Sequence, residues 1–199
     1  KLVMAPTGLR QRLIRLIDRE RRRAEAGQPA EIVAKMNSLI DDEIIETLYT
    51  ASRSGVRIQL NVRGICALRP GVPGASETIE VVSVVDRFLE HPRVYYFLNG
   101  GDEEVYLASA DWMTRNLDKR LELMWPVEQA GHKARVIGAL RAMFRDTAKA
   151  WILKPDGSYE RKQPSPGETP FRVQQALQDE ARRTASLARD AAGIRFVPE

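Results

Sequence analysis

Strand-like and helix-like segments alternate over the first third of this 199-residue chain, and this alternation is the strongest constraint on its fold. Short apolar runs at residues 2–5, 31–36 and 56–62 are separated by segments whose apolar residues recur at helical spacing. Asp41 or Asp42 can cap the second of these helices, and Gly55 can end it. The order strand, helix, strand, helix, strand is typical of an α/β domain with parallel strands.

The pattern changes after residue 62. A loop rich in glycine and proline (64–78) precedes a strand at 79–85, and a hairpin around Asn99-Gly-Gly-Asp102 joins strands within 88–97 and 105–116. A strand at 120–127, an amphipathic helix around 136–144, a hairpin at 151–160 and a long Ala/Arg-rich helix follow. We therefore expect a mixed, largely parallel sheet flanked by helices in residues 1–147. A hairpin and helix (148–199) are expected as a C-terminal appendage of the same domain.

Composition excludes several classes of protein. The chain has no run of about 18 uncharged apolar residues, so we expect no transmembrane segment. The single cysteine, Cys66, cannot form an internal disulfide and fits a reducing, cytoplasmic setting, and two histidines with one cysteine argue against a zinc site. The net charge of +4 favours anionic partners, although a solvated basic face gives the same value. The start at Lys1, directly in an apolar run, suggests a piece of a longer protein.

The groups best suited to chemistry lie around the predicted hairpin. His91-Pro-Arg93 precedes one strand, and Ser109-Ala-Asp111-Trp follows the other and leads into Arg115-Asn116. Imidazole, guanidinium, hydroxyl and amide groups together can hold and transfer a phosphoryl group. Taken alone, a histidine at a strand entrance is more often a surface residue or a hydrogen-bonded one, and Ser109 and Asp111 can simply cap a turn.

Further candidates stand at the ends of predicted strands. Arg63 ends the strand at 56–62, and Lys35 and Asn37 end the strand at 31–36. Ligands of α/β folds gather at the carboxyl ends of parallel strands, where a planar guanidinium can bridge two phosphate oxygens. The structural alternatives are a salt-bridged arginine and a solvated lysine.

Five segments, in this order, resemble the C-terminal part of bacterial polyphosphate kinases, a branch of the phospholipase D-like superfamily. They are Lys1-Leu-Val-Met-Ala-Pro-Thr7, Ile32-Val-Ala-Lys-Met-Asn-Ser-Leu39, Gly55-Val-Arg-Ile-Gln-Leu-Asn-Val-Arg-Gly64, and the segments around His91 and Ser109. The resemblance implies an α/β phospholipase D-like half-domain. It also implies reversible transfer of the terminal phosphate of ATP to inorganic polyphosphate through a phosphohistidine.

Enzymes of this superfamily use a His-x-Lys pair and a Gly/Ser-x-Asn turn in each of two halves. His91-x-Arg93 with Ser109-x-Asp111 resembles the second half-site, so the resemblance implies that His91 assists transfer while the phosphorylated histidine lies outside this chain. It also implies that Arg63 contacts ATP. The further ATP or phosphate contacts expected from the strand ends and the turn are Lys35, Asn37, Arg93, Ser109, Asp111, Arg115 and Asn116.

The resemblance also implies partners. We expect Mg²⁺ to accompany ATP, with no metal ligand in this chain, and we expect ADP and polyphosphate as the other substrates. The remaining N-terminal part of the enzyme and further copies of the chain are the expected protein partners, with no nucleic acid.

Two alternatives remain open. A phosphodiesterase or nuclease half of the superfamily is disfavoured because Arg93 replaces lysine, Leu98 replaces the acidic residue of the motif and Asp111 replaces asparagine. These replacements are expected in the polyphosphate kinase branch. A non-enzymatic polyanion-binding module is compatible with the basic charge. In either reading, this chain alone is expected to be inactive as a kinase.

Overall fold

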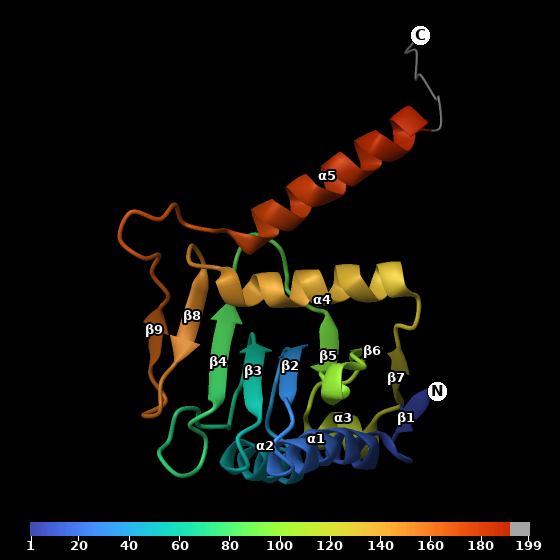
Figure 1. Ribbon diagram of the computed structural model, residues 1–199, viewed down its shortest axis with the longest axis vertical. Helices are drawn as coiled ribbons and strands as arrows, with labels where there is room; N and C mark the ends of the chain where they lie inside the picture. The colour runs from blue at the N-terminus through green and yellow to red at the C-terminus, as the bar shows by residue number, and fades with distance from the viewer. Residues whose placement is uncertain (192–199) are drawn as a thin grey trace.

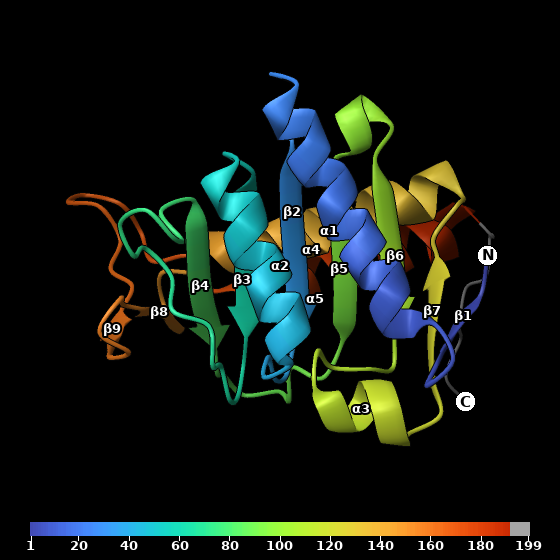
Figure 2. The same cartoon turned by 90° about the horizontal axis from the view of Figure 1, so that it is seen from below.

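The computed structural model describes residues 1–191, which form a sheet between two helical layers (Figures 1 and 2). Helices α1 and α2 cover one face, and α4 and α5 lie on the other side. The strands are β1 (Val3–Ala5), β2 (Glu31–Met36), β3 (Arg57–Val62), β4 (Ile79–Val84), β5 (Arg93–Phe97), β6 (Glu104–Ala108), β7 (Glu122–Pro126), β8 (Ala150–Leu153) and β9 (Tyr159–Arg161). The helices are α1 (Leu9–Glu25), α2 (Asp42–Arg53), the 3₁₀ turn η1 (Asn99–Gly101), α3 (Thr114–Lys119), α4 (Ala130–Arg145) and α5 (Val173–Ala191).

The strand order in the sheet is β1-β7-β6-β5-β2-β3-β4-β8-β9. The expected mixed sheet flanked by helices is confirmed, but the expectation that it is largely parallel is wrong. Among the described residues, only β2–β3 and β3–β4 pair in parallel, and the other six pairings are antiparallel. Two of these six pairings have a local cause, because β5 and β6 are joined by the short turn η1 and β8 and β9 by another turn. Short connections of this kind allow only antiparallel neighbours.

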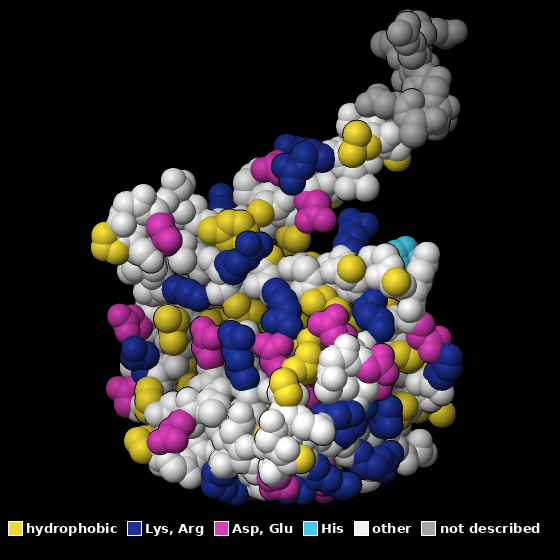
Figure 3. Space-filling view, viewed as in Figure 1, with side chains coloured by type: hydrophobic (Ala, Val, Ile, Leu, Met, Phe, Trp, Pro, Cys, Tyr) yellow, Lys and Arg dark blue, Asp and Glu magenta, His cyan; other side chains and the backbone are white. Residues whose placement is uncertain are grey.

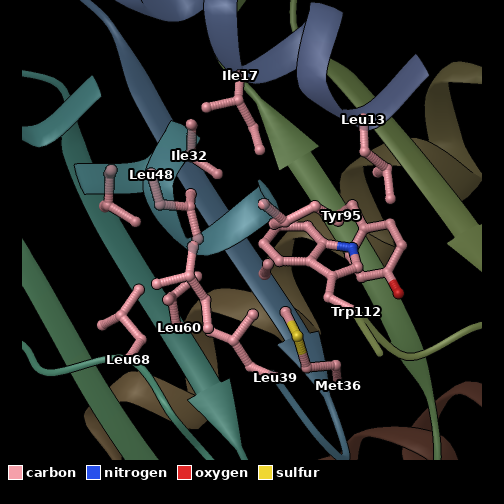
Figure 4. Close-up of a cluster of buried hydrophobic side chains, with 14 of the residues drawn as sticks. Leu13, Ile17, Ile32, Met36, Leu39, Leu48, Leu60, Leu68, Tyr95 and Trp112 are labelled. Atoms are coloured by element: carbon pink, nitrogen blue, oxygen red, sulfur yellow. The ribbon is translucent and has the colours of Figure 1, made fainter. Parts of the chain in front are cut away.

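The larger core lies between the sheet and the layer formed by α1 and α2. Leu13 and Ile17 of α1 and Leu48 of α2 are fully buried in one cluster with Ile32 and Leu60 of the parallel strands, and Leu13 lies beside the ring of Tyr95 (Figure 4). This burial follows from the helical spacing of the apolar residues in the sequence. The predicted cap of α2 is confirmed, because the Asp41 side chain accepts a hydrogen bond from the Ile44 N–H (3.2 Å).

The second core lies beneath α4. Leu140, Met143 and Phe144 pack there with side chains of β2, β4 and β5. Helix α5 contributes buried Val173 and partly buried Leu177 at its start, and beyond them it projects away from the body (Figure 1). No helix in residues 1–191 is both long enough and apolar enough to cross a membrane.

The predicted C-terminal hairpin and helix are present as β8–β9 and α5, although residues 192–199 lie outside the described part. The hairpin extends the main sheet through antiparallel pairing of β8 with β4, and the boundary at residue 147 stays a prediction. Helix α3 was not expected from the sequence. Its six residues are too short to show a helical period.

Candidate active site

The predicted site residues converge on one edge of the sheet. This edge contains the carboxyl ends of the parallel strands β2 and β3, the start of β5, and the turn between β6 and α3 (Figure 2). Strands β2 and β5 are antiparallel neighbours, so the end of one lies beside the beginning of the other. Segments far apart in the sequence therefore meet here.

Asp111 is the centre of the hydrogen-bond network at this edge. Its carboxylate accepts four hydrogen bonds: from the Asn37 backbone N–H (2.7 Å) and Nδ2 (3.3 Å), and from Arg93 Nε (3.1 Å) and Nη2 (3.0 Å). The residue is 5% exposed. A buried carboxylate engaged in this way organises neighbouring cations and repels phosphate, so we assign Asp111 to the framework of the site and not to phosphate contact.

The turn that carries Asp111 is fixed at three points. The buried Tyr95 hydroxyl donates to the Ala110 carbonyl (2.5 Å), and the Trp112 carbonyl accepts the N–H groups of Ile40 and Asp41 (2.9 and 3.0 Å). The Asn116 side-chain oxygen accepts the Asp111 N–H (2.9 Å). Burial raises the pKa of Tyr95 well above its ordinary value, so the hydroxyl stays a donor. Asn116 thus supports the turn and is itself buried.

Arg93 connects this framework to His91. While Nε and Nη2 of its guanidinium bind Asp111, Nη1 lies 3.0 and 3.2 Å from the two ring nitrogens of His91 and donates to the His91 carbonyl (3.1 Å). The Arg93 side chain is 13% exposed, whereas His91 is exposed. The planar fork of an arginine can serve both partners at once, which a lysine ammonium cannot do in this geometry.

Arg63 supplies the accessible positive charge. Its Nε donates to Asn37 Oδ1 (3.2 Å), and the side chain is half-buried at the end of β3. Within the described part of the chain, its two Nη groups donate no hydrogen bond and no carboxylate forms a salt bridge with it. A chain of hydrogen bonds therefore runs from His91 through Arg93, Asp111 and Asn37 to Arg63, and it leaves two guanidinium amino groups free for an anion.

Lys35 lies beneath this edge and has no exposed surface. Its ammonium donates to the carbonyls of Met36 and Glu90 (3.1 Å each). Burial lowers the pKa of Lys35 to about 8, and the nearby Glu90 carboxylate acts in the opposite direction. The geometry gives Lys35 a main-chain anchoring role and not the direct phosphate contact that the sequence suggested.

Two further predicted residues lie apart from the network. The Ser109 hydroxyl donates to the Glu122 carboxylate and accepts the Leu123 N–H (3.0 Å), so it is directed to β7. Arg115 is exposed on the first turn of α3 and makes no contact with the network among the described residues. Residues 1–191 hold no cluster of three or more histidine, cysteine, aspartate and glutamate side chains that could bind a metal ion.

One side chain at this edge was missed by the sequence analysis. Gln174, in the first turn of α5, hydrogen-bonds the segment that precedes His91. No sequence pattern marks a single glutamine more than eighty residues away from the motif it contacts.

Most of the chain matches the model of one protein family. Residues 2–174 match the model described as polyphosphate kinase C-terminal domain 2. The chain belongs to the polyphosphate kinase family. Among relatives, polyphosphate kinases of Rhodopirellula baltica and Pseudomonas aeruginosa are 55% and 52% identical over 177 residues, which is 89% of this chain. The chain spans only 21% and 26% of the length of these two relatives.

Solved structures agree with this family. The crystal structure of polyphosphate kinase from Porphyromonas gingivalis superposes with a TM-score of 0.90 at 37% identity, covering 94% of this chain and 28% of that protein. Nuc of Salmonella typhimurium, a phospholipase D family member, matches with a TM-score of 0.54 at 14% identity over 81% of this chain and 97% of its own. This second likeness confirms the predicted phospholipase D-like fold, and at this identity it supports no statement about function.

Proposed function

We propose that this polyphosphate kinase domain is one half of the active site of an ATP:polyphosphate phosphotransferase. The observation that carries the proposal is the hydrogen-bonded chain from His91 to Arg63, which joins an exposed imidazole to a guanidinium with free donors. Asn37 and Arg63 lie at the carboxyl ends of the parallel strands β2 and β3, beside the start of β5 that carries His91 and Arg93, in a member of the polyphosphate kinase family. The activity, the substrates and the partners of the whole enzyme are part of this proposal.

In the proposed reaction, the bond between the γ-phosphorus of ATP and the oxygen bridging to ADP breaks as a histidine nitrogen outside this chain bonds to phosphorus. A terminal oxygen of polyphosphate then attacks the phosphorus, and the histidine nitrogen leaves. Arg63 stabilises the charge on the transferring phosphoryl oxygens through its free amino groups. His91, held by Arg93, gives a proton to the departing oxygen or takes one from the entering oxygen.

Magnesium enters this proposal with the nucleotide. The described residues offer no carboxylate cluster, and the one central carboxylate, Asp111, is occupied by Arg93 and Asn37, so we assign no metal ligand to residues 1–191. Mg²⁺ bound to ATP screens the charge of the triphosphate. A cytoplasmic location and assembly with further copies of the chain are also proposed, as the family resemblance implies.

A non-enzymatic polyanion-binding role is the second candidate, since Lys and Arg side chains gather over α1 along the lower edge of the molecule (Figure 3). Many of these cations already have carboxylate partners. Arg19 pairs with Glu104 (3.0 Å), and Arg21 and Arg22 both pair with Asp18 (2.8 and 3.0 Å). The α1 surface therefore offers less free positive charge than its composition suggests, and the kinase proposal is favoured.

The test is phosphoryl labelling of the full-length enzyme with γ-labelled ATP. His91→Ala should still accept label on the histidine outside this chain, but slowly, and polyphosphate synthesis should fall by about 10²–10⁴-fold because proton transfer is lost. His132→Ala, which removes an exposed histidine of α4, is the matched control and should behave as wild type. Label on the peptide that contains His91 in the wild-type enzyme would contradict the proposed roles.

A further inference from the structure

The segment between β4 and β5, which ends at His91, is held by the start of α5. Figure 1 shows this segment rising from β4 to reach the first turn of α5 and returning to β5. The segment exposes apolar side chains, with Phe88 50% and Leu89 69% exposed, so its own side chains contribute little burial to fix it. Its position must depend on polar contacts from neighbouring elements.

Gln174 supplies the closest set of these contacts. Its side-chain oxygen accepts the Phe88 N–H (2.9 Å), and its Nε2 donates to the Phe88 carbonyl (2.8 Å) and to Glu90 Oε1 (2.7 Å). The residue is 7% exposed. Both ends of one buried amide are therefore used on the two residues that lie three and one positions before His91.

Two other side chains fix the same segment. Lys35 donates to the Glu90 carbonyl from below (3.1 Å), and Arg172 forms a two-pronged ion pair with Asp86 (2.7 and 2.8 Å). At the start of β5, Arg93 Nη1 donates a hydrogen bond to the His91 carbonyl (3.1 Å). The main chain leading to the imidazole is thus anchored from β2, from α5 and from β5, and only α5 comes from the C-terminal part of the chain.

We propose that Gln174 is a positioning residue for the reaction: it holds the 86–90 segment so that His91 stays against Arg93 and within reach of the transferring phosphoryl group. The proposal rests on the function proposed above. An exposed imidazole must be held to a fraction of an ångström to handle a proton efficiently, and a rigid neighbouring element supplies that restraint. It follows that α5, which otherwise projects from the body, is coupled to the active site through its first turn.

The test is a double-mutant cycle in the full-length enzyme, with Gln174→Met and His91→Ala. Methionine keeps the length and burial of the side chain but removes the amide. We expect Gln174→Met to lower kcat by about 10- to 100-fold in the wild-type background, as misplacement of a catalytic group does, and to have no further effect in the His91→Ala background. A purely structural role would lower activity by the same factor in both backgrounds.

Gln175→Met is the matched control, because Gln175 is the exposed next residue and hydrogen-bonds only to Asp179 within α5 among the described residues. It should leave kcat unchanged. Hydrogen exchange provides a readout independent of activity: the Phe88 amide should lose protection in Gln174→Met and keep it in Gln175→Met. Gln174→Glu, a near-isostere that places a carboxylate against Glu90, is the second variant if the methionine protein does not fold. The same pattern of kcat is expected, whereas its carboxylate still accepts the Phe88 N–H, so the hydrogen-exchange test applies to Gln174→Met.

The outcomes separate the two proposals. Equal losses in both backgrounds, unchanged kcat in the single variant, or unchanged protection of Phe88 would each overturn the positioning role while leaving the proposed function intact. If His91→Ala alone leaves synthesis unchanged, then the proposed function fails and the positioning role fails with it.

Discussion

Arg63 and Asp111 carry opposite charges at the same edge of the sheet, and they have different roles there. The Asp111 carboxylate accepts hydrogen bonds from Asn37 and Arg93, whereas the two amino groups of Arg63 have no partner among residues 1–191. The carboxylate therefore fixes the framework, and in the proposed mechanism the positive charge that faces an incoming phosphate comes mainly from Arg63. This difference cannot be seen in the sequence, where both residues are simply polar groups that follow strands.

At this scale we predict that Arg63→Ala in the full-length enzyme raises the activation barrier by roughly 2–4 kcal/mol, as the loss of charge-assisted donors in a transition state does. Arg63→Lys should recover little, because an ammonium cannot present two parallel donors. Steady-state rates of polyphosphate synthesis measure both effects. Arg53→Ala, at an exposed position of α2, is the control. Near-normal turnover of a folded Arg63→Ala enzyme would return Arg63 to a structural role.

Lys35 leads to a prediction about pH. Its pKa falls from an ordinary 10.5 to about 8, so the folded chain binds fewer protons than the unfolded chain between these values, and stability should rise with pH across that window. Above pH 10.5 the lysine is neutral in both states and its burial carries no charge penalty. As the pH falls through about 8 the buried amine is protonated, and the free energy of unfolding is then lower by about 3 kcal/mol, which corresponds to the pKa shift. Urea unfolding at several pH values should show this rise in wild type and not in Lys35→Met. Exposed Lys119→Met should keep it, and equal pH profiles for all three proteins would contradict the assignment.

At the scale of elements, periodicity and turn residues predict most of this fold. Strands β2 and β3, helices α1 and α2, and the hairpin at Asn99 all follow from local patterns. The direction of pairing was predicted less well, because the parallel rhythm of residues 2–62 does not continue through the hairpins. Site residues could be placed at strand ends, but their partners could not. Whether Lys35 meets a phosphate or the Glu90 carbonyl depends on how a distant segment folds back, and Gln174 has no local signal at all.

Asp146 connects α4, β8 and α5, and this leads to a prediction about the stability of the fold. This fully buried carboxylate follows α4 and accepts the N–H groups that start β8 and α5, from Ala148, Lys149, Ala150 and Val173. Asp146→Ala leaves these donors without their acceptor and should lower the free energy of unfolding by about 3 kcal/mol, measured by urea titration. Asp156→Ala, in the exposed turn between β8 and β9, is the control and should cost much less. A loss below about 0.5 kcal/mol for Asp146→Ala, the range of ordinary surface changes, would show that solvent replaces the carboxylate.

At the scale of the whole molecule, the proposed mechanism requires a second histidine that this chain does not supply. The chain spans about a quarter of the length of the relatives that it matches, and its other histidine, His132, is exposed on α4 with no partner motif. The position of α5 adds a consequence. A helix that projects from the body and touches the His91 segment at its base can transmit contacts made elsewhere in the full enzyme to the site.

We predict that the isolated 199-residue chain does not make polyphosphate from ATP, because it offers proton transfer and charge stabilisation but no nucleophile in the proposed mechanism. The purified chain is incubated with ATP and Mg²⁺, and polymer is measured beside the full-length enzyme at equal concentration. The His91→Ala chain is the matched control, since any polymer made equally by both preparations comes from a contaminant. Synthesis by the wild-type chain that is lost in the His91→Ala chain would mean that His91 itself accepts the phosphoryl group, and the division of roles between the two halves would have to be reversed.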